Sequence, residues 1–259
     1  LITAAHQDDR LPTLTRYDRW GARVDEIRYC PEQLEARRRV LGAGVLSPLP
    51  ETERLLKAYL LNQNGEGGVT CPLAMTDGLA AMLEDYGTPE QQKRWGPLVR
   101  DPGSPTPLTG GQFVTEKQGG SVVSENEAVA RLAPDGSWRL TGLKWFCSNP
   151  GELWVTTAKP EGSRFVGLFL MPRRRPDGSL NDCHILRLKE ICGTRGKATA
   201  EVEYQGAYAE LVGKPSQGIA ILMRSVLRTS RLHVAAGGLG MSRRAYLEAR
   251  RYADERLVL

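Results

Sequence analysis

Six short segments between residues 122 and 204 constrain the fold more than any other feature of this sequence. Each has the length and the β-branched or aromatic content of a strand, and turn signals such as Pro134-Asp135-Gly136 separate them. The segments are residues 122–132, 137–141, 153–158, 166–171, 184–188 and 198–204. Short strands at this spacing, separated by glycine- and proline-containing turns, indicate an antiparallel sandwich or barrel.

The residues on both sides of this region have helical spacing instead. Residues 51–63 carry apolar side chains at helical spacing, which predicts an amphipathic helix. Residues 71–85 predict a more apolar helix, with Pro72 near its start and Gly87 just past its end. A third helix is predicted over 89–98, because Thr88 and Gln91 form a capping-box pattern around Pro89. Residues 1–50 are polar and contain prolines, so we expect a loosely structured arm with one strand-like segment at 24–29.

These patterns predict an α+β multidomain fold. It comprises an N-terminal arm and helical domain (1–108), a β-domain (109–213) and a long helical segment that begins a C-terminal domain (214–259). The last residues, Arg256-Leu257-Val258-Leu259, are mostly apolar and lack a terminal glycine, so we expect a helix that has been cut. The chain starts at Leu1 without an initiator methionine or signal-peptide pattern, which suggests a fragment.

A glycine-rich stretch, Thr109–Ser121, joins the helical and β-rich parts. Its four glycines allow close approach of the backbone to another group, and its Thr, Ser and amide side chains can bind a polar ligand edge. Composition alone leaves two interpretations open, a plain connector and a ligand-binding loop.

Charge and cysteine usage exclude several classes of protein. The net charge of +5 is too small to identify a nucleic-acid-binding surface. Five scattered cysteines without a CxxC pair argue against disulfides and zinc, and we expect a reducing, cytoplasmic location. The three histidines have no ligand spacing, so no metal is expected, and no apolar run approaches the ~20 residues of a membrane span.

Several motifs, in this order, resemble the acyl-CoA dehydrogenase family of flavoproteins and within it the AidB-like branch. They are Arg16-Tyr17-Asp18-Arg19-Trp20-Gly21, Cys71-Pro72-Leu73-Ala74-Met75-Thr76, the segment 110–121 with its Thr-Glu-x-x-Gly-Gly-Ser core, Gly142-Leu143-Lys144-Trp145-Phe146-Cys147-Ser148, the turn from Leu188 to Arg195, and the helix with Arg231 and Arg256. The resemblance covers nearly the whole chain.

The resemblance implies an FAD site on the β-domain. The residues that match the family's cofactor-binding positions are Val114, Thr115, Gly120, Ser121, Phe146, Cys147, Ser148 and Arg256. By this match Phe146 lies against the isoalloxazine ring and Ser148 is its hydroxyl partner, whereas strand alternation turns Trp145 the other way. Ser121 and Arg231 match positions on the coenzyme A side. Arg256 matches an arginine that contacts FAD across a subunit boundary, which implies an oligomer.

The sequence also departs from the family. Val122 replaces the usual Asp after Gly-Gly-Ser, and the helical bundle that supplies the proton-abstracting Glu in most members does not follow. Some members place this base one residue before the helix arginine, where this chain has Ser230, and a serine hydroxyl is no base near neutral pH without activation. Glu116 and Glu127 are expected to be structural, so the catalytic residue is unknown.

Three explanations of the missing base stay open. The chain is a truncated enzyme, or one part of a split enzyme whose partner chain supplies the bundle, or a degenerate member kept for binding. The leading functional hypothesis is an FAD-dependent oxidoreductase for the α,β-dehydrogenation of an acyl-CoA thioester. The alternatives are a DNA-associated alkylation-protection protein, as in the AidB-like branch, and a non-catalytic assembly subunit.

Overall fold

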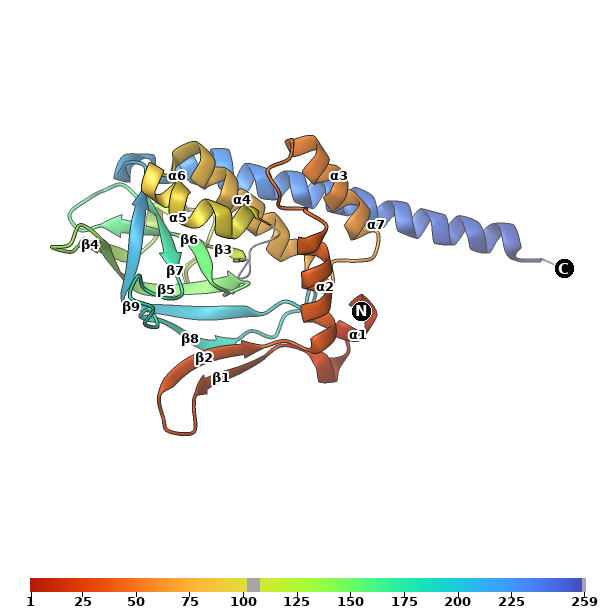
Figure 1. Ribbon diagram of the computed structural model, residues 1–259, viewed down its shortest axis with the longest axis horizontal. Helices are drawn as coiled ribbons and strands as arrows, with labels where there is room; N and C mark the ends of the chain where they lie inside the picture. The colour runs from red at the N-terminus through yellow and green to blue at the C-terminus, as the bar shows by residue number, and fades with distance from the viewer. Residues whose placement is uncertain (102–107, 258–259) are drawn as a thin grey trace.

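The computed structural model describes residues 1–101 and 108–257 of the 259-residue chain. The first hundred residues begin with a short helix and continue with a β-hairpin and further helices (Figure 1). The hairpin pairs β1 (Thr13–Tyr17) with β2 (Arg23–Arg28). The helices of this part are α1 (Ile2–Ala5), α2 (Pro31–Gly42), α3 (Glu51–Asn62), α4 (Thr70–Tyr86) and α5 (Pro89–Arg100). The three predicted helices are therefore confirmed.

The predicted capping box at the start of α5 is present. The Thr88 hydroxyl accepts a hydrogen bond from the backbone N–H of Gln91 at 3.2 Å, and the Gln91 side-chain oxygen accepts from the backbone N–H of Thr88 at 3.0 Å. Both bonds satisfy donors that the first helical turn leaves without partners.

The prediction of a loosely structured N-terminal arm is wrong, although its strand at 24–29 is confirmed as β2. The hairpin is anchored to the β-domain through arginines. The guanidinium of Arg23 donates to the carbonyl oxygens of Cys183 (3.0 Å) and Asn181 (2.7 Å), and that of Arg173 donates to the carbonyl of Val24 (3.0 Å). The two residues of each hydrogen bond are about 150 residues apart along the chain, so no local sequence pattern predicts these contacts.

The middle of the chain forms a β-barrel. Its strands are β3 (Gly110–Phe113), β4 (Val129–Leu132), β5 (Trp138–Ser148), β6 (Leu153–Pro160), β7 (Gly167–Pro172), β8 (Cys183–Leu188) and β9 (Thr199–Val212). Pairing runs β6–β7–β9–β5–β4 and back to β6, which closes the ring, and β8 adds to β9. Five of the six predicted segments are confirmed as strands. Of the sixth, residues 122–132, only Val129–Leu132 is a strand, and β3 and β4 each run parallel to β6.

Two cores lie on opposite faces of the same strands. One fills the barrel and includes Phe113, Trp154 and Tyr204. The other lies between the barrel wall and the helices α4 and α5, with Leu79 and Leu153 among its residues. Every residue of β7 is buried for this reason, and its sequence is apolar throughout rather than alternating.

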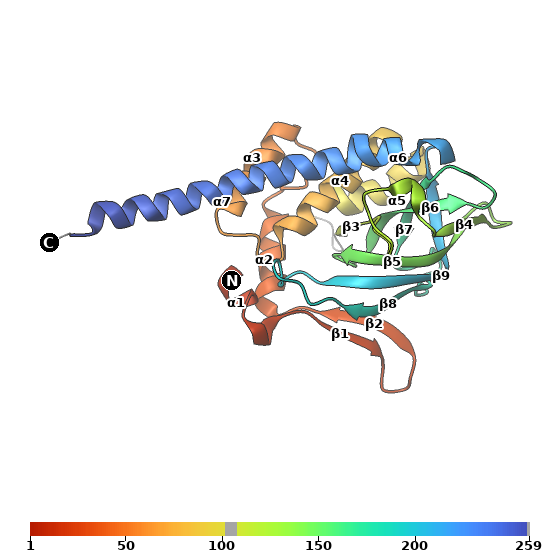
Figure 2. The same ribbon diagram turned by 180° about the vertical axis from the view of Figure 1, so that it is seen from behind.

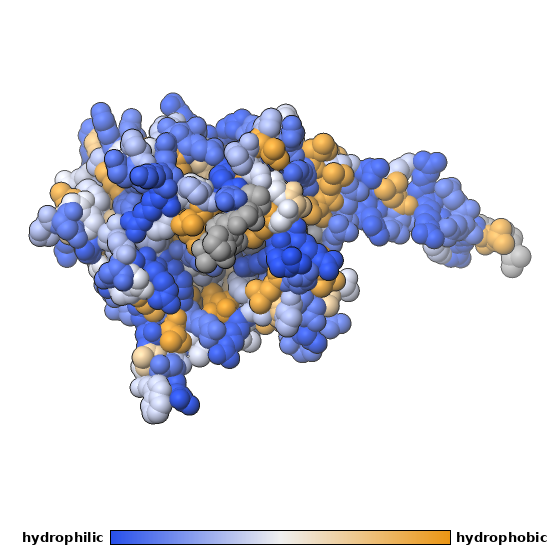
Figure 3. Space-filling model, in the orientation of Figure 1, coloured by the Kyte–Doolittle hydropathy of each residue, from blue (hydrophilic) through white to orange (hydrophobic). Residues whose placement is uncertain are grey.

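The last helical segment starts on the barrel and leaves it. It consists of α6 (Gly218–Ile221), a π-helical turn (Leu222–Leu227) and α7 (Arg228–Glu255). Figures 1 and 2 show α7 running past α3 and α4 and then projecting beyond the body. Residues 241–255 are exposed, and Figure 3 shows this part as mostly hydrophilic with scattered apolar groups. The helix ends at Glu255, and Val258 and Leu259 lie outside the described residues.

The buried face of α3 differs from the predicted apolar face. Leu56 and Leu60 are exposed, whereas Arg54, Ala58 and Asn62 are buried. Asn62 and the main chain at Tyr59 meet α7 at Gly237 and Gly240, and Arg54 pairs with Asp77 on α4. Polar side chains face inward here because neighbouring helices supply their partners. The division into domains at residues 109 and 214 stays a prediction.

No helix in the described part of the chain combines the length and the apolar character that a membrane span requires.

Candidate functional site

The glycine-rich stretch begins as strand β3 and continues as an exposed loop. Glu116 and Gly119 pair their backbones at 3.1 Å in both directions, and Gly119 has a φ of +148°, which favours glycine. A Cβ on Gly120 would lie 2.5 Å from the hydroxyl oxygen of Thr115, so glycine is needed for this close approach. Thr115 and Gly120, both predicted to bind the cofactor, therefore touch. Ser121 is exposed beside them.

The second predicted segment lies at the end of β5, where the strand contains a β-bulge. Lys144 pairs with Val202 and Cys147 with Ala200, so two residues of β5 stand opposite one residue of β9. The extra residue turns both Trp145 and Phe146 outward. The ammonium of Lys189 lies 3.6 Å from the centroid of the Trp145 ring and 4.6 Å from that of the Phe146 ring. The prediction that Trp145 faces away from Phe146 is wrong, because the bulge interrupts the alternation.

Phe146 and Cys147 have opposite surroundings. Phe146 is 48% exposed, a large value for an aromatic ring on a barrel strand. Cys147 is fully buried in the barrel core, and burial raises the pKa of its thiol. The predicted contact between Cys147 and the cofactor can therefore involve only the backbone of this residue.

The two segments are held together directly. The backbone N–H of Trp145 donates to the carbonyl of Thr115 at 2.9 Å. Beneath this bond, the buried ammonium of Lys144 lies 2.6 Å from the carboxylate of Glu116. That carboxylate also accepts from the backbone N–H groups of Glu127 (2.6 Å) and Ala128 (3.3 Å). Burial opposes ionisation of Glu116, but Lys144 and these hydrogen bonds outweigh it and lower its pKa. Glu116 is thus a structural anion, as predicted.

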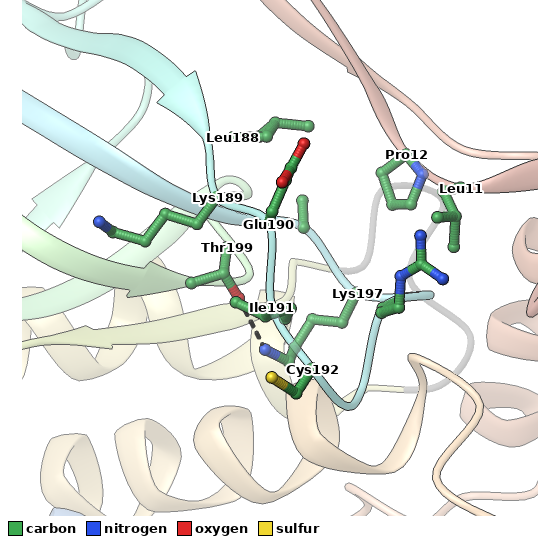
Figure 4. A pocket seen from close by; sticks show the side chains of 11 residues that line it. Leu11, Pro12, Leu188, Lys189, Glu190, Ile191, Cys192, Lys197 and Thr199 are labelled. Carbon is green, nitrogen blue, oxygen red and sulfur yellow. Dashed lines mark hydrogen bonds between the residues drawn. The ribbon is translucent and has the colours of Figure 1, made fainter. Parts of the chain in front are cut away.

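Ser148 lies in a polar cluster that the sequence did not reveal. Its hydroxyl is 3.2 Å from that of Thr199, its cross-strand partner, and accepts a hydrogen bond from the ammonium of Lys197 at 2.9 Å. Lys197 also donates to Thr199 at 2.8 Å (Figure 4). We call Ser148, Thr199 and Lys197 the hydroxyl–lysine cluster. In the sequence, Lys197 stands two residues before the first residue of β9, Thr199, and nothing there indicates a contact with Ser148.

The cluster borders a pocket of about 700 Å³. The turn that follows β8 lines one side of this pocket, together with Lys197 and Thr199, and the arm residues Leu11 and Pro12 line the other (Figure 4). Lys189, which touches both aromatic rings of β5, is also in this lining and pairs with Glu201 at 2.7 Å. The folded arm therefore contributes to the site.

The long helix places Ser230 against β3. The Ser230 hydroxyl accepts from the side-chain amide of Gln112 at 2.7 Å and lies 3.4 Å from the carbonyl of Ala74. It has no carboxylate or imidazole partner within hydrogen-bonding distance among the described residues, so nothing activates it as a base.

The two arginines predicted to serve the site are exposed and far apart. At a rise of about 1.5 Å per residue, Arg231 and Arg256 are separated by roughly 35 Å along α7. Among the described residues, the side chain of Arg256 pairs with Tyr252, at the end of α7 that projects from the body. This chain alone does not bring Arg256 to the residues on β3 and β5.

Comparison with known proteins identifies two levels of similarity. Residues 2–102 match the family model described as the adaptive response protein AidB N-terminal domain. Nearly the whole chain also matches curated proteins. It is 33% identical to the putative acyl-CoA dehydrogenase AidB of Escherichia coli, covering 95% of this chain and 48% of that protein. It is also 33% identical to acyl-CoA dehydrogenase family member 11 of Caenorhabditis elegans, covering 95% and 43%.

A solved structure agrees with these matches. The crystal structure of C. elegans ACDH-11 in complex with C11-CoA superposes with a TM-score of 0.88 at 31% sequence identity, covering 100% of this chain and 46% of that one. The chain thus spans less than half the length of these curated relatives.

Proposed function

Because this chain is a member of the acyl-CoA dehydrogenase family, in its AidB-like branch, we propose that it binds FAD and takes part in the α,β-dehydrogenation of an acyl-CoA thioester. The observation that carries this proposal is the bulged end of β5, which presents Phe146 and Ser148 beside the loop of Thr115 and Gly120. The C. elegans relative was crystallised with C11-CoA, which supports a thioester substrate.

The residues present fit a flavin. An exposed aromatic ring at Phe146 offers an apolar wall, and the absence of a Cβ at Gly120 lets the loop backbone pack closely against the Thr115 hydroxyl. The Val114 backbone and the Thr115 hydroxyl would bind the polar edge of the ring, and Gly120 and Ser121 the ribityl or phosphate groups. Ser148 and the backbone of Cys147 would complete the site on the β5 side.

Bound FAD would supply a two-electron acceptor that takes a hydride from Cβ of the thioester while a base removes the proton from Cα. The residues of this chain would orient the ring and exclude water. Arg231 and Ser121, both exposed, would contact the coenzyme A part of the substrate.

The base is proposed to come from outside the described residues. Near the site, Glu116 is held by Lys144 and backbone N–H groups, and the Ser230 hydroxyl is engaged by Gln112. Neither group is free to accept a proton from a substrate. We therefore infer that catalysis needs a further segment or a partner chain that supplies a carboxylate.

An oligomer follows from the position of Arg256. This side chain can reach a flavin only if the projecting end of α7 meets the β-domain of another subunit. All five cysteines are free, in keeping with the cytoplasmic location that we propose.

The test is a spectrum of the purified full chain after incubation with FAD and removal of excess cofactor. We expect flavin absorbance at about one FAD per chain, and bleaching by acyl-CoA thioesters only when a base-supplying segment or partner is present. Absence of bound flavin in both conditions would rule out the cofactor assignment.

The alternative functions predict other outcomes. A DNA-associated protein would bind duplex DNA with an affinity that falls steeply as salt rises, because phosphate contacts release counterions. A pure assembly subunit would oligomerise without retaining flavin at saturating FAD.

A further inference from the structure

Lys197 is a buried cation without a counterion. Its residue is only 5% exposed, and no carboxylate in the described parts of the chain lies within ion-pairing distance of its ammonium. Its ammonium donates hydrogen bonds to the neutral hydroxyls of Ser148 and Thr199. An ammonium has three N–H donors, so the third has no side-chain acceptor among the described residues. Burying an unpaired charge is costly, so an electron-rich group is expected to approach this cluster.

The neighbouring charges do not supply that group. Glu201, on the same strand, is already paired with Lys189 and Arg187, both at 2.7 Å. Glu66, in the loop before α4, accepts from the backbone N–H groups of Gly68 and Cys71. The cluster is therefore locally positive.

One hydroxyl proton of the hydroxyl–lysine cluster has no acceptor inside the cluster. Both hydroxyl oxygens accept from Lys197, and they lie 3.2 Å from each other. The contact between them uses the proton of one hydroxyl, whichever donates. The other hydroxyl proton then remains available to an acceptor outside the cluster. The oxygen of that hydroxyl already accepts from Lys197 and from its neighbour, so this group can act outward only as a donor.

We propose that Lys197 is a positioning residue for the flavin, which holds the Ser148 hydroxyl as a donor toward the ring and places a positive charge behind it. This inference rests on the proposed FAD site. It adds a preference for the reduced flavin, which the site residues alone do not give. A fixed positive charge favours the reduced flavin, which carries more negative charge than the oxidised form.

The test compares the reduction of bound FAD in the full chain with Lys197→Met, which removes the charge at similar length. We expect the ratio of reduced to oxidised FAD, in equilibrium with a reference dye, to fall at least tenfold in K197M, or about 30 mV for a two-electron couple. Lys159→Met, on β6 and outside the cluster, is the matched control and should leave the ratio unchanged. If K197M does not fold, K197Q carries the same expectation.

Ser148→Ala tests the positioning role. If Lys197 acts partly through this hydroxyl, the effects of S148A and K197M on the ratio will not add in the double variant. Bound FAD with the same ratio in wild type and K197M would overturn the role of Lys197 while leaving the FAD site intact. Failure of the wild type to bind FAD, in contrast, would overturn the proposed function and this inference with it.

Discussion

At the scale of single residues, the ion pair of Lys144 and Glu116 holds the glycine-rich loop to β5. Replacing Lys144 by Met leaves the Glu116 carboxylate buried without its cation. We expect the free energy of unfolding to fall by about 3–5 kcal/mol, measured by urea denaturation. The double variant K144M/E116Q should recover part of this loss, since no charge is then buried. A double variant less stable than K144M would contradict the assignment.

Gly120 is the residue whose replacement should affect cofactor binding most selectively. In G120A the new Cβ would lie 2.5 Å from the Thr115 hydroxyl oxygen and displace it. We expect FAD affinity, measured by fluorescence titration, to fall by about tenfold, the worth of one hydrogen bond of roughly 1.4 kcal/mol. The melting temperature should change little. Gly96→Ala, where a Cβ meets nothing within 4 Å, is the control; an equal loss of affinity there would argue against a local effect.

Individual site residues were predictable where motifs carry them, and not elsewhere. The motif match led to Thr115, Gly120, Phe146 and Ser148, and the structure gathers them on two adjoining segments. It could not reveal the outward turn of Trp145, because a bulge depends on the register of the partner strand. Lys197 was missed for a related reason. Its contact with Ser148 depends on how β5 pairs with β9, which the sequence alone does not show.

At the scale of helices and strands, small residues let α7 approach α3. A Cβ on Gly240 would lie 2.3 Å from the carbonyl oxygen of Tyr59, whereas one on Gly238 would meet nothing within 4 Å. We expect G240A to lower the free energy of unfolding by about 1–3 kcal/mol. G238A should be neutral or stabilising by up to about 1 kcal/mol, because alanine favours a helix interior. Equal effects in urea denaturation would show that the close approach is unimportant.

Asp77 on α4 joins three other helices and predicts a pH dependence. Its carboxylate contacts His233 on α7 at 2.8 Å, Arg54 on α3 at 3.0 Å, and Arg100 on α5. Burial opposes its ionisation, yet His233 and the two guanidinium groups outweigh burial and lower its pKa below the ordinary value of 3.8. Its stabilising contribution is therefore complete above about pH 4 and is lost as the pH falls below that value.

We expect D77N to cost about 3–5 kcal/mol of unfolding free energy at pH 7, because it removes the buried anion that Arg54, Arg100 and His233 share. The difference from wild type should shrink at pH 3. Urea denaturation at both values measures it, with the exposed Asp254→Asn as control. A difference that is the same at pH 3 and pH 7 would exclude Asp77 as the titrating group.

Elements with strong local signals were predicted best. The capping box located α5, and glycine- and proline-containing turns located the barrel strands. Only the second strand of the hairpin was predicted, and α2 was missed, because their contacts lie far along the chain. Strand β1 packs beside β8, and Gln33 of α2 donates to the carbonyls of Gly68 and Gly196. The burial of Arg54 and Asn62 on α3 could not be predicted either. These polar side chains are stable in the interior because neighbouring helices supply their hydrogen-bond and ion-pair partners.

At the scale of the whole molecule, the body and the projecting end of α7 have different roles. Within the described parts of the chain, the recognised partner of the Arg256 side chain is Tyr252, on the same projecting helix. If Arg256 serves the flavin of another subunit, R256A should lower FAD affinity roughly tenfold, the loss of one charged hydrogen bond. The melting temperature should stay the same. Arg251→Ala, which breaks an exposed pair with Glu255, is the control; equal affinity in both variants and wild type would remove Arg256 from the site.

The bulge of β5 has a consequence for how such a site can arise. Relative to a regular barrel strand it amounts to the insertion of one additional residue. That insertion leaves Lys144 and Cys147 facing the interior and adds an aromatic side chain to the outer surface. One additional residue is thus enough to give the outer wall of a barrel an aromatic surface suited to a planar ligand, while the residues that pack the interior keep their places.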